Sequence, residues 1–175
     1  IYNRGTNRHL FQQNKVNKYN WTTVGSSFGN SELNFAVLFS QLEHLDQIIS
    51  KRKIIYEKYV DNFKNLEKYG VKIQNLQNTS KSNYSSFYLL TNNMAERDEL
   101  IKYLKINGIA SQFHYVNLHD SPMGKKITRS KSLKISESVT TRVIRLPIYP
   151  DLKNSETNKI VDFVSKYFES KYQNT

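Results

Sequence analysis

The most constraining feature of this sequence is an apolar stretch near its N-terminal end, ELNFAVLFSQLEHLDQII (residues 32–49). Hydrophobic side chains occupy nearly every position from Leu33 to Phe39, so a helix here has almost no polar face. A helix that is hydrophobic all round is buried, or packs on a partner as well as on its own domain. Too little sequence precedes it to build a second compact domain. We therefore expect the chain to be half of something larger.

The stretch before this helix is polar, basic and aromatic: RGTNRHLFQQNKVNKYNWTTVGSSFGN (residues 4–30). A loop of this length at the edge of a compact domain is uncommon unless it binds something. In its GSSF segment, Ser26 and Ser27 offer hydroxyls and backbone N–H groups before a helix, which suits a phosphate but equally an ordinary turn. Arg8 and Trp21, upstream, would suit a nucleotide diphosphate, although a solvated loop explains them equally well.

Downstream, hydrophobic periodicity predicts short strands alternating with helices. An amphipathic helix runs from Ser50 to Tyr69, where Gly70 is a stop signal. We predict strands at 71–76, 84–91, 110–116 and 143–149, helices at 94–109, 132–142 and 154–171, and a second polar loop at 117–132. Asn154 or Ser155 is the expected cap of the last helix. This order predicts an α/β fold, a small sheet covered by helices on one face.

Composition limits the classes of function. The chain has 175 residues and a net charge of +11, which invites a nucleic-acid interpretation. The charge comes from dispersed Lys more than Arg, and no nucleic-acid-binding motif accompanies it, so we expect no nucleic-acid partner. There is no cysteine, which excludes disulfides and thiolate metal sites and suits a cytoplasmic setting. No apolar run is long enough to suggest a membrane span.

Histidines are the main candidates for chemistry. His114 and His119 lie five residues apart in FHYVNLHD, next to Tyr115 and Asp120. That spacing is not a recognised metal pattern, so no metal site is predicted. The two histidines and the tyrosine could line a pocket for a sugar or phosphate, or decorate the surface. No catalytic motif of another kind is present, so the residues alone indicate an α/β domain with a ligand-facing loop.

Several motifs, in order and spacing, resemble a known family: GTNR, KYNWTTVGSSF, SELNFAVLFSQLE, FHYVNLHDSPMGKK and RLPIYPDL. They resemble the C-terminal part of DegT/DnrJ/EryC1/StrS-type sugar-nucleotide aminotransferases. The resemblance is strongest to the dTDP-4-oxo-6-deoxy-D-glucose transaminases that make dTDP-4-amino-4,6-dideoxygalactose. It covers essentially the whole chain.

The resemblance implies a fold type I architecture, in which a large cofactor domain precedes a long connecting helix and a small C-terminal α/β domain. On this basis 1–30 is an active-site and interface loop, 31–69 the connecting helices and 70–175 the small domain. The lysine that bonds pyridoxal 5'-phosphate belongs to the large domain, which is absent here. The chain alone is therefore expected to be inactive and to contain no catalytic residue.

The resemblance also implies roles for individual residues. Ser27, where most relatives have Asn, and Ser26 would contact the cofactor phosphate of the neighbouring subunit of a homodimer. Nucleotide-sugar contacts would come from the remaining candidates: Arg8, Trp21, His114, Tyr115 and His119. The apolar helix would pack in the subunit interface or on the large domain. The parent enzyme would transfer an amino group, expected from glutamate, to a 4-keto-6-deoxy sugar nucleotide for surface polysaccharide or lipopolysaccharide synthesis. The alternative is a non-enzymatic binding domain that reuses this half-fold.

Overall fold

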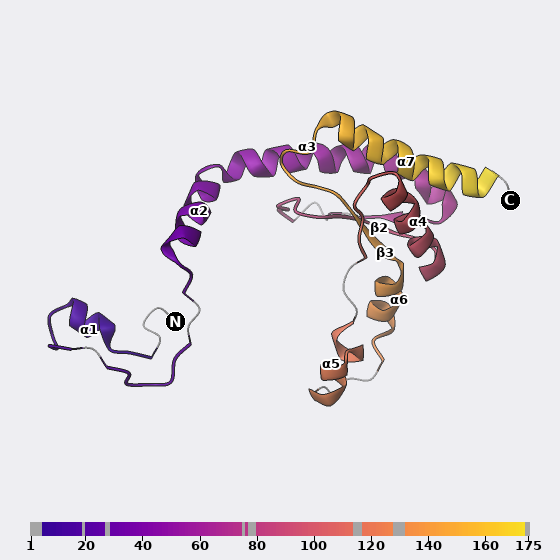
Figure 1. Cartoon of the computed structure of the whole chain (residues 1–175). Coiled ribbons are helices and arrows are strands. Elements are labelled where there is room, and N and C mark those ends of the chain that lie inside the picture. The colour runs from indigo at the N-terminus through magenta and orange to yellow at the C-terminus, as the bar shows by residue number, and fades with distance from the viewer. Residues whose placement is uncertain are drawn as a thin grey trace. The chain divides into compact units, whose positions relative to one another are not determined.

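The structure, a computed structural model, describes residues 5–18, 20–26, 29–74, 76, 80–113, 117–127 and 132–173. The chain divides into two compact units, Ile1–Leu45 and Asp46–Thr175, each of which is described by itself (Figure 1). The three-part division at 30/31 and 69/70, which rests on the family resemblance, stays a prediction.

The first unit begins with a closed loop that contains a short helix, α1 (Arg8–Gln12), which the sequence pattern did not predict. Thr6 and Trp21 form an antiparallel bridge, and the backbone N–H groups of Thr22 and Thr23 donate to the Gly5 carbonyl at 2.8 and 2.9 Å. Gly5 has a φ of +79°, and a Cβ there would lie 2.1 Å from the Thr23 carbonyl oxygen. Only glycine therefore fits where the two ends of this loop meet.

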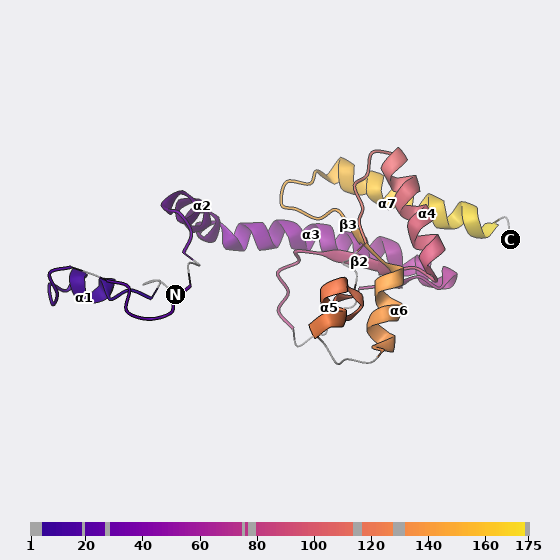
Figure 2. The same ribbon diagram turned by 60° about the horizontal axis from the view of Figure 1, so that its bottom comes forward.

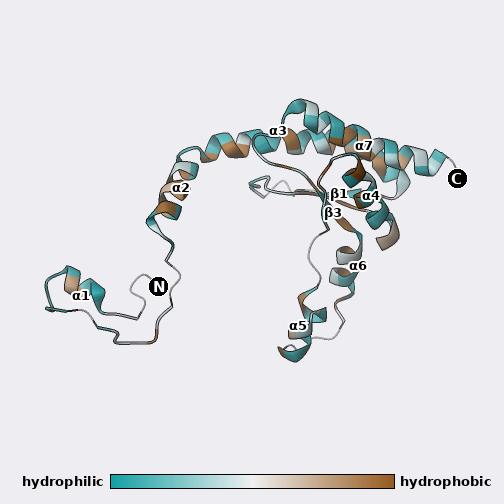
Figure 3. Cartoon of the chain, viewed as in Figure 1, coloured by the Kyte–Doolittle hydropathy of each residue, from teal (hydrophilic) through white to brown (hydrophobic). Residues whose placement is uncertain are grey.

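Helix α2 (Glu32–Glu43) follows, and it begins where the sequence predicts. The Ser31 Oγ accepts a hydrogen bond from the Asn34 N–H, which satisfies one of the free donors of the first turn. No residue of α2 is buried, and Leu33 and Phe39 are 79% and 64% exposed. Residues coloured as hydrophobic recur along the ribbon of this helix (Figure 3). Within the first unit α2 is thus exposed, and its packing on a partner or on another domain stays a prediction.

The second unit is built on a three-stranded antiparallel sheet in the order β1 (Lys72–Ile73), β2 (Phe87–Leu90), β3 (Val143–Leu146). Phe87 pairs with Leu146 and Leu90 with Val143. Successive side chains of a strand point to opposite faces, and β2 buries only every second residue. One face of the sheet therefore carries the core.

Three helices cover that face: α3 (Leu45–Phe63), α4 (Met94–Ile106) and α7 (Asn154–Gln173). A short 3-10 helix, η1 (Lys64–Tyr69), extends α3 and ends at Gly70, as the sequence predicts. Figure 1 shows α3 and α7 along the same side of the sheet. Tyr56, Tyr59 and Phe63 of α3 pack on Phe87, with ring centroids 5.0–6.0 Å apart. This aromatic cluster joins the longest helix to the central strand.

Three local predictions differ from the structure. Instead of a strand at 110–116, the described residues form a single bridge, in which Gln112 and Arg145 exchange both backbone hydrogen bonds; 114–116 lie outside the described residues. The loop 117–132 contains η2 (Leu118–Asp120) and α5 (Pro122–Ile127). Ser121 Oγ accepts from the Gly124 N–H, and proline at the first helical position costs no hydrogen bond, which explains α5.

The cap of α7 also differs, because Asn154 is already helical. The Lys153 N–H, just before the helix, donates to the Glu156 carboxylate at 2.8 Å instead. Among the helices of the described residues, none combines the length and hydrophobicity needed to cross a bilayer.

Candidate active-site wall

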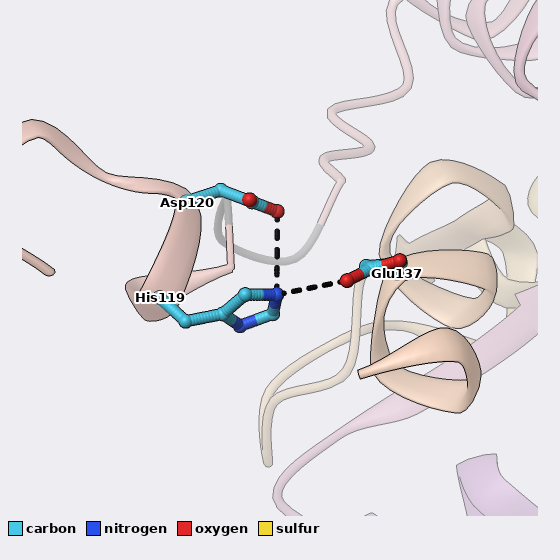
Figure 4. A group of neighbouring side chains, drawn as sticks. All are labelled: His119, Asp120 and Glu137. Carbon is cyan, nitrogen blue, oxygen red and sulfur yellow. Dashed lines mark hydrogen bonds and ion pairs between the residues drawn. The ribbon is translucent and has the colours of Figure 1, made fainter. Parts of the chain in front are cut away.

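In the second unit, a contact between His119 and Glu137 joins the segment that follows residue 116 to helix α6 (Lys134–Arg142) (Figure 4). The Nε2 atom of His119 lies 3.1 Å from Oε1 of Glu137 and 3.4 Å from Oδ2 of Asp120. The His119 side chain is only 12% exposed. Its ring therefore lies in a fixed place between η2 and α6.

Glu137 lies in the first turn of α6 and accepts three hydrogen bonds. The Leu133 N–H donates to Oε1 at 2.7 Å and the Ser132 hydroxyl to Oε2 at 2.9 Å, while His119 supplies the third. These bonds favour the ionised carboxylate, so the pKa of Glu137 lies below its ordinary value of 4.5, with the Leu133 N–H as the largest cause. A negative charge is also favourable at a helix N-terminus.

Asn117 makes the second link between the two segments. Its Oδ1 accepts from the Ser136 hydroxyl at 2.8 Å and from the Thr140 hydroxyl at 2.7 Å, both on α6. Figure 2 shows α5 and α6 next to each other below α3. Residues 117–121 are thus held along one side of α6 by side-chain hydrogen bonds and not by a hydrophobic core.

The ligand-type atoms of His119, Asp120 and Glu137 lie within 4.8 Å of one another, which is close enough to hold a metal ion. However, both carboxylate oxygens of Glu137 already accept hydrogen bonds from backbone or side-chain donors. The geometry therefore favours a structural clamp, and the absence of a metal site stays a prediction.

The candidate residues from the sequence fall into three groups. Ser27, His114 and Tyr115 lie outside the described residues. His119 belongs to the second unit, with the clamp just described. Arg8, Trp21 and Ser26 belong to the first unit and are exposed, Trp21 at 75%. Thr6, which lies two residues before Arg8, forms an antiparallel bridge with Trp21. The backbone that leads into Arg8 therefore lies beside Trp21. Their binding roles stay predictions.

Ser26 provides the test of fit to a cofactor phosphate. Because Ser31 caps α2, Ser26 lies five residues before the helix cap and does not occupy the helix N-terminus itself. Its exposed position still leaves its hydroxyl available as a donor to an oxyanion. Ser26 can therefore supply one of the several hydrogen-bond donors that a phosphate group requires.

Sequence reasoning missed Asn117 and Glu137. Glu137 carried a signal, since an acidic residue in the first turn of a helix commonly bonds the backbone before it. Asn117 carried none, because its two partners lie 19 and 23 residues away in the chain.

Comparison with known proteins places these features in a family. The family model "DegT/DnrJ/EryC1/StrS aminotransferase family" matches residues 3–165. The chain is 34% identical over 144 residues to a dTDP-4-amino-4,6-dideoxy-D-glucose transaminase of Escherichia coli, covering 79% of this chain and 38% of that protein. It is 26% identical over 150 residues to a GDP-perosamine synthase of Vibrio cholerae, covering 83% and 39%.

Among solved structures, a DegT DnrJ EryC1 StrS aminotransferase from Brucella abortus superimposes with a TM-score of 0.76 at 25% identity, covering 92% of this chain and 42% of that chain. The present chain thus spans about two fifths of the length of the relatives it matches. The family model extends over nearly the whole chain, and the fold agrees. The chain belongs to the DegT/DnrJ/EryC1/StrS aminotransferase family.

Proposed function

We propose that this chain is the C-terminal portion of a pyridoxal-phosphate-dependent aminotransferase. The parent enzyme transfers an amino group from glutamate to a 4-keto-6-deoxy sugar nucleotide. The observation that carries the proposal is the 34% identity to a dTDP-4-amino-4,6-dideoxy-D-glucose transaminase over 79% of the chain. The fold of the parent is fold type I, its assembly a homodimer and its compartment the cytoplasm.

When bound, the cofactor supplies an electron sink that lets a C–H proton leave the carbon bearing nitrogen. This chain's residues bind and orient. Ser26 and Ser27 donate hydrogen bonds to the cofactor phosphate, and Arg8 and Trp21 contact the nucleotide. His119, held by Glu137, lines the sugar side together with His114 and Tyr115. An imidazole whose Nε2 atom is held between Glu137 and Asp120 is already in place and needs little reorganisation when substrate arrives.

The test uses the full-length protein, purified with pyridoxal phosphate and supplied with glutamate and dTDP-4-keto-6-deoxyglucose. Mass spectrometry is expected to show the amino sugar nucleotide, and none when either substrate is omitted. A parallel reaction with a GDP-linked 4-keto sugar distinguishes the nucleotide. Failure with both acceptors, in a protein that has bound the cofactor, would contradict the proposed substrate class.

Two variants of the full-length protein test the site residues separately. Ser27→Ala is expected to weaken retention of the cofactor during dialysis, because a phosphate contact is lost. His114→Ala is expected mainly to raise the KM for the nucleotide sugar. If both variants matched the parent protein, the residue roles would be wrong even with the activity right.

A further inference from the structure

Arg145 projects from the face of the sheet that the helical core leaves free. Its neighbours on β3, Ile144 and Leu146, are buried in the core, so alternation directs Arg145 to the opposite face. Its cross-strand partner on that face is Tyr88 of β2. On its other side, Arg145 exchanges both backbone hydrogen bonds with Gln112. The arginine is therefore anchored through its backbone between two neighbouring segments.

A hollow of about 350 Å³ lies at this position. Its polar lining comes from Ser85, Gln112, Arg145 and Tyr149, and the remainder is aliphatic. Arg145 is the sole charged residue among the described residues that line it. A small hollow with a few convergent polar groups and one charge is typical of a site for a small polar ligand.

The guanidinium of Arg145 forms no hydrogen bond or ion pair with any residue in the described ranges, although its side chain is partly buried. Two other arginines of this unit use theirs: Arg97 bonds Asp98 at 2.7 Å, and Arg142 bonds the Ser138 hydroxyl at 3.1 Å. Partial burial of a cation without a counter-charge is unfavourable, and an arriving anion removes that cost.

We propose that Arg145 binds a carboxylate group of the amino-acid donor, an inference that rests on the proposed function. A single guanidinium matches one planar carboxylate through two parallel hydrogen bonds. A diphosphate carries more charge than one cation balances, and no second cation lines the described part of the hollow. Gln112, on the wall of the hollow, lies two residues before His114 in the chain, and His114 is the residue proposed above to contact the sugar. In a transamination both substrates visit the same site in turn.

The test compares Arg145→Gln with the parent in the full-length enzyme, and varies glutamate and nucleotide sugar separately. Because hydrogen bonds to charged groups are among the stronger ones, KM for glutamate is expected to rise about 10- to 100-fold, with KM for the nucleotide sugar nearly unchanged. Arg145→Lys keeps the positive charge but not the planar guanidinium that makes two parallel hydrogen bonds. Its KM for glutamate should therefore lie between those of the parent and of Arg145→Gln. Arg142→Gln, which removes a nearby guanidinium bonded within its own helix, is the control.

Glutarate, a dicarboxylate that cannot donate an amino group, gives a readout without turnover. Calorimetry of the full-length protein is expected to show weaker glutarate binding by Arg145→Gln, by the same factor as the rise in KM. An inactive parent protein would contradict the proposed function alone, since glutarate binding still tests Arg145. Equal glutarate binding by parent and variant, or a rise in KM confined to the nucleotide sugar, would overturn the carboxylate assignment.

Discussion

His119 and Glu137 lie 18 residues apart in the chain, yet the imidazole Nε2 and a carboxylate oxygen are 3.1 Å apart. This pair joins η2 to the first turn of α6 and so holds residues 117–121, which form one edge of the candidate active-site wall. Neither η2 nor α5 contains a buried residue, so the position of this segment depends on side-chain hydrogen bonds.

Removing the charge at Glu137 is therefore expected to loosen this segment. In Glu137→Gln, the amide is a weaker acceptor for the Leu133 N–H and for His119. Amide hydrogen exchange is expected to be several-fold faster at Leu133 and across 117–121, with the core strands unchanged. Glu57→Gln, an exposed site on α3, is the control. Unchanged exchange at Leu133 would show that Glu137 does not hold the segment.

The same clamp predicts a pH dependence. The pKa of Glu137 is lowered in the folded protein, so its stabilising effect is fully present above the ordinary value of 4.5. The effect is lost as the pH falls below that value through the lowered pKa. The protection factors of 117–121, which correct exchange for its intrinsic pH dependence, should therefore fall in acid for the parent but not for Glu137→Gln. The same fall in both proteins would assign it to another group.

Two glycines allow backbone strain to be separated from steric contact. Gly70 and Gly108 have φ angles of +80° and +73°, but a Cβ at Gly70 would lie 2.3 Å from Asn92 Oδ1, whereas at Gly108 the nearest atom is 3.8 Å away. Gly108→Ala is expected to cost about 1–2 kcal/mol, the penalty of a left-handed non-glycine residue.

Gly70→Ala is expected to cost at least about 1 kcal/mol more, because Asn92 must move and lose its 2.8 Å hydrogen bond to the Tyr69 carbonyl. Urea unfolding of the two variants measures the difference in the free energy of unfolding. Equal costs would mean that Asn92 relaxes freely, and that the contact at Gly70 has no energetic weight.

Buried phenols predict sensitivity to alkali. Burial is the largest cause that raises the pKa of Tyr56 and of Tyr167 to about 12 in each case. The folded state therefore holds the two phenolic protons up to a higher pH than the unfolded state does. The contribution of these two tyrosines to stability is fully present below pH 10 and is lost as the pH rises toward 12. Urea unfolding across this range should show a shallower decline in Tyr56→Phe than in the parent. An identical decline would remove Tyr56 as a cause.

The exposed apolar side chains of α2 predict a partner surface in the full-length protein. Phe39 is 64% exposed here, although burying such a side chain contributes about 1.5–3 kcal/mol. Phe39→Asp in the full-length protein is therefore expected to lower the melting temperature or to dissociate the proposed homodimer, as measured by thermal unfolding and size-exclusion chromatography. Gln41→Asp, which adds a charge at a polar position of the same helix, is the control. Equal behaviour of the two variants would show that α2 is uncovered in the parent.

Local patterns predicted most of the elements. Local sequence signals predicted three elements: the amphipathic helix that ends at Gly70, the helix after Asn93 and the strand from Val143. These signals lie within a few residues of one another in the chain. The strand predicted at 110–116 failed because pairing depends on a partner, and only Gln112 meets one among the described residues. Propensity alone does not show how many residues a neighbouring strand can pair.

The sequence by itself determined the family, the helical periodicities and the all-apolar character of α2, since each depends on residue identity and near neighbours. Only the tertiary structure decided that His119 meets Glu137, that Asn117 bonds α6, and that the Arg145 guanidinium lies beside a hollow with no bonding partner among the described residues. Those relationships join residues far apart in the chain. They depend on the packing of the sheet and helices, and no short-range pattern encodes the distance between side chains that folding brings together.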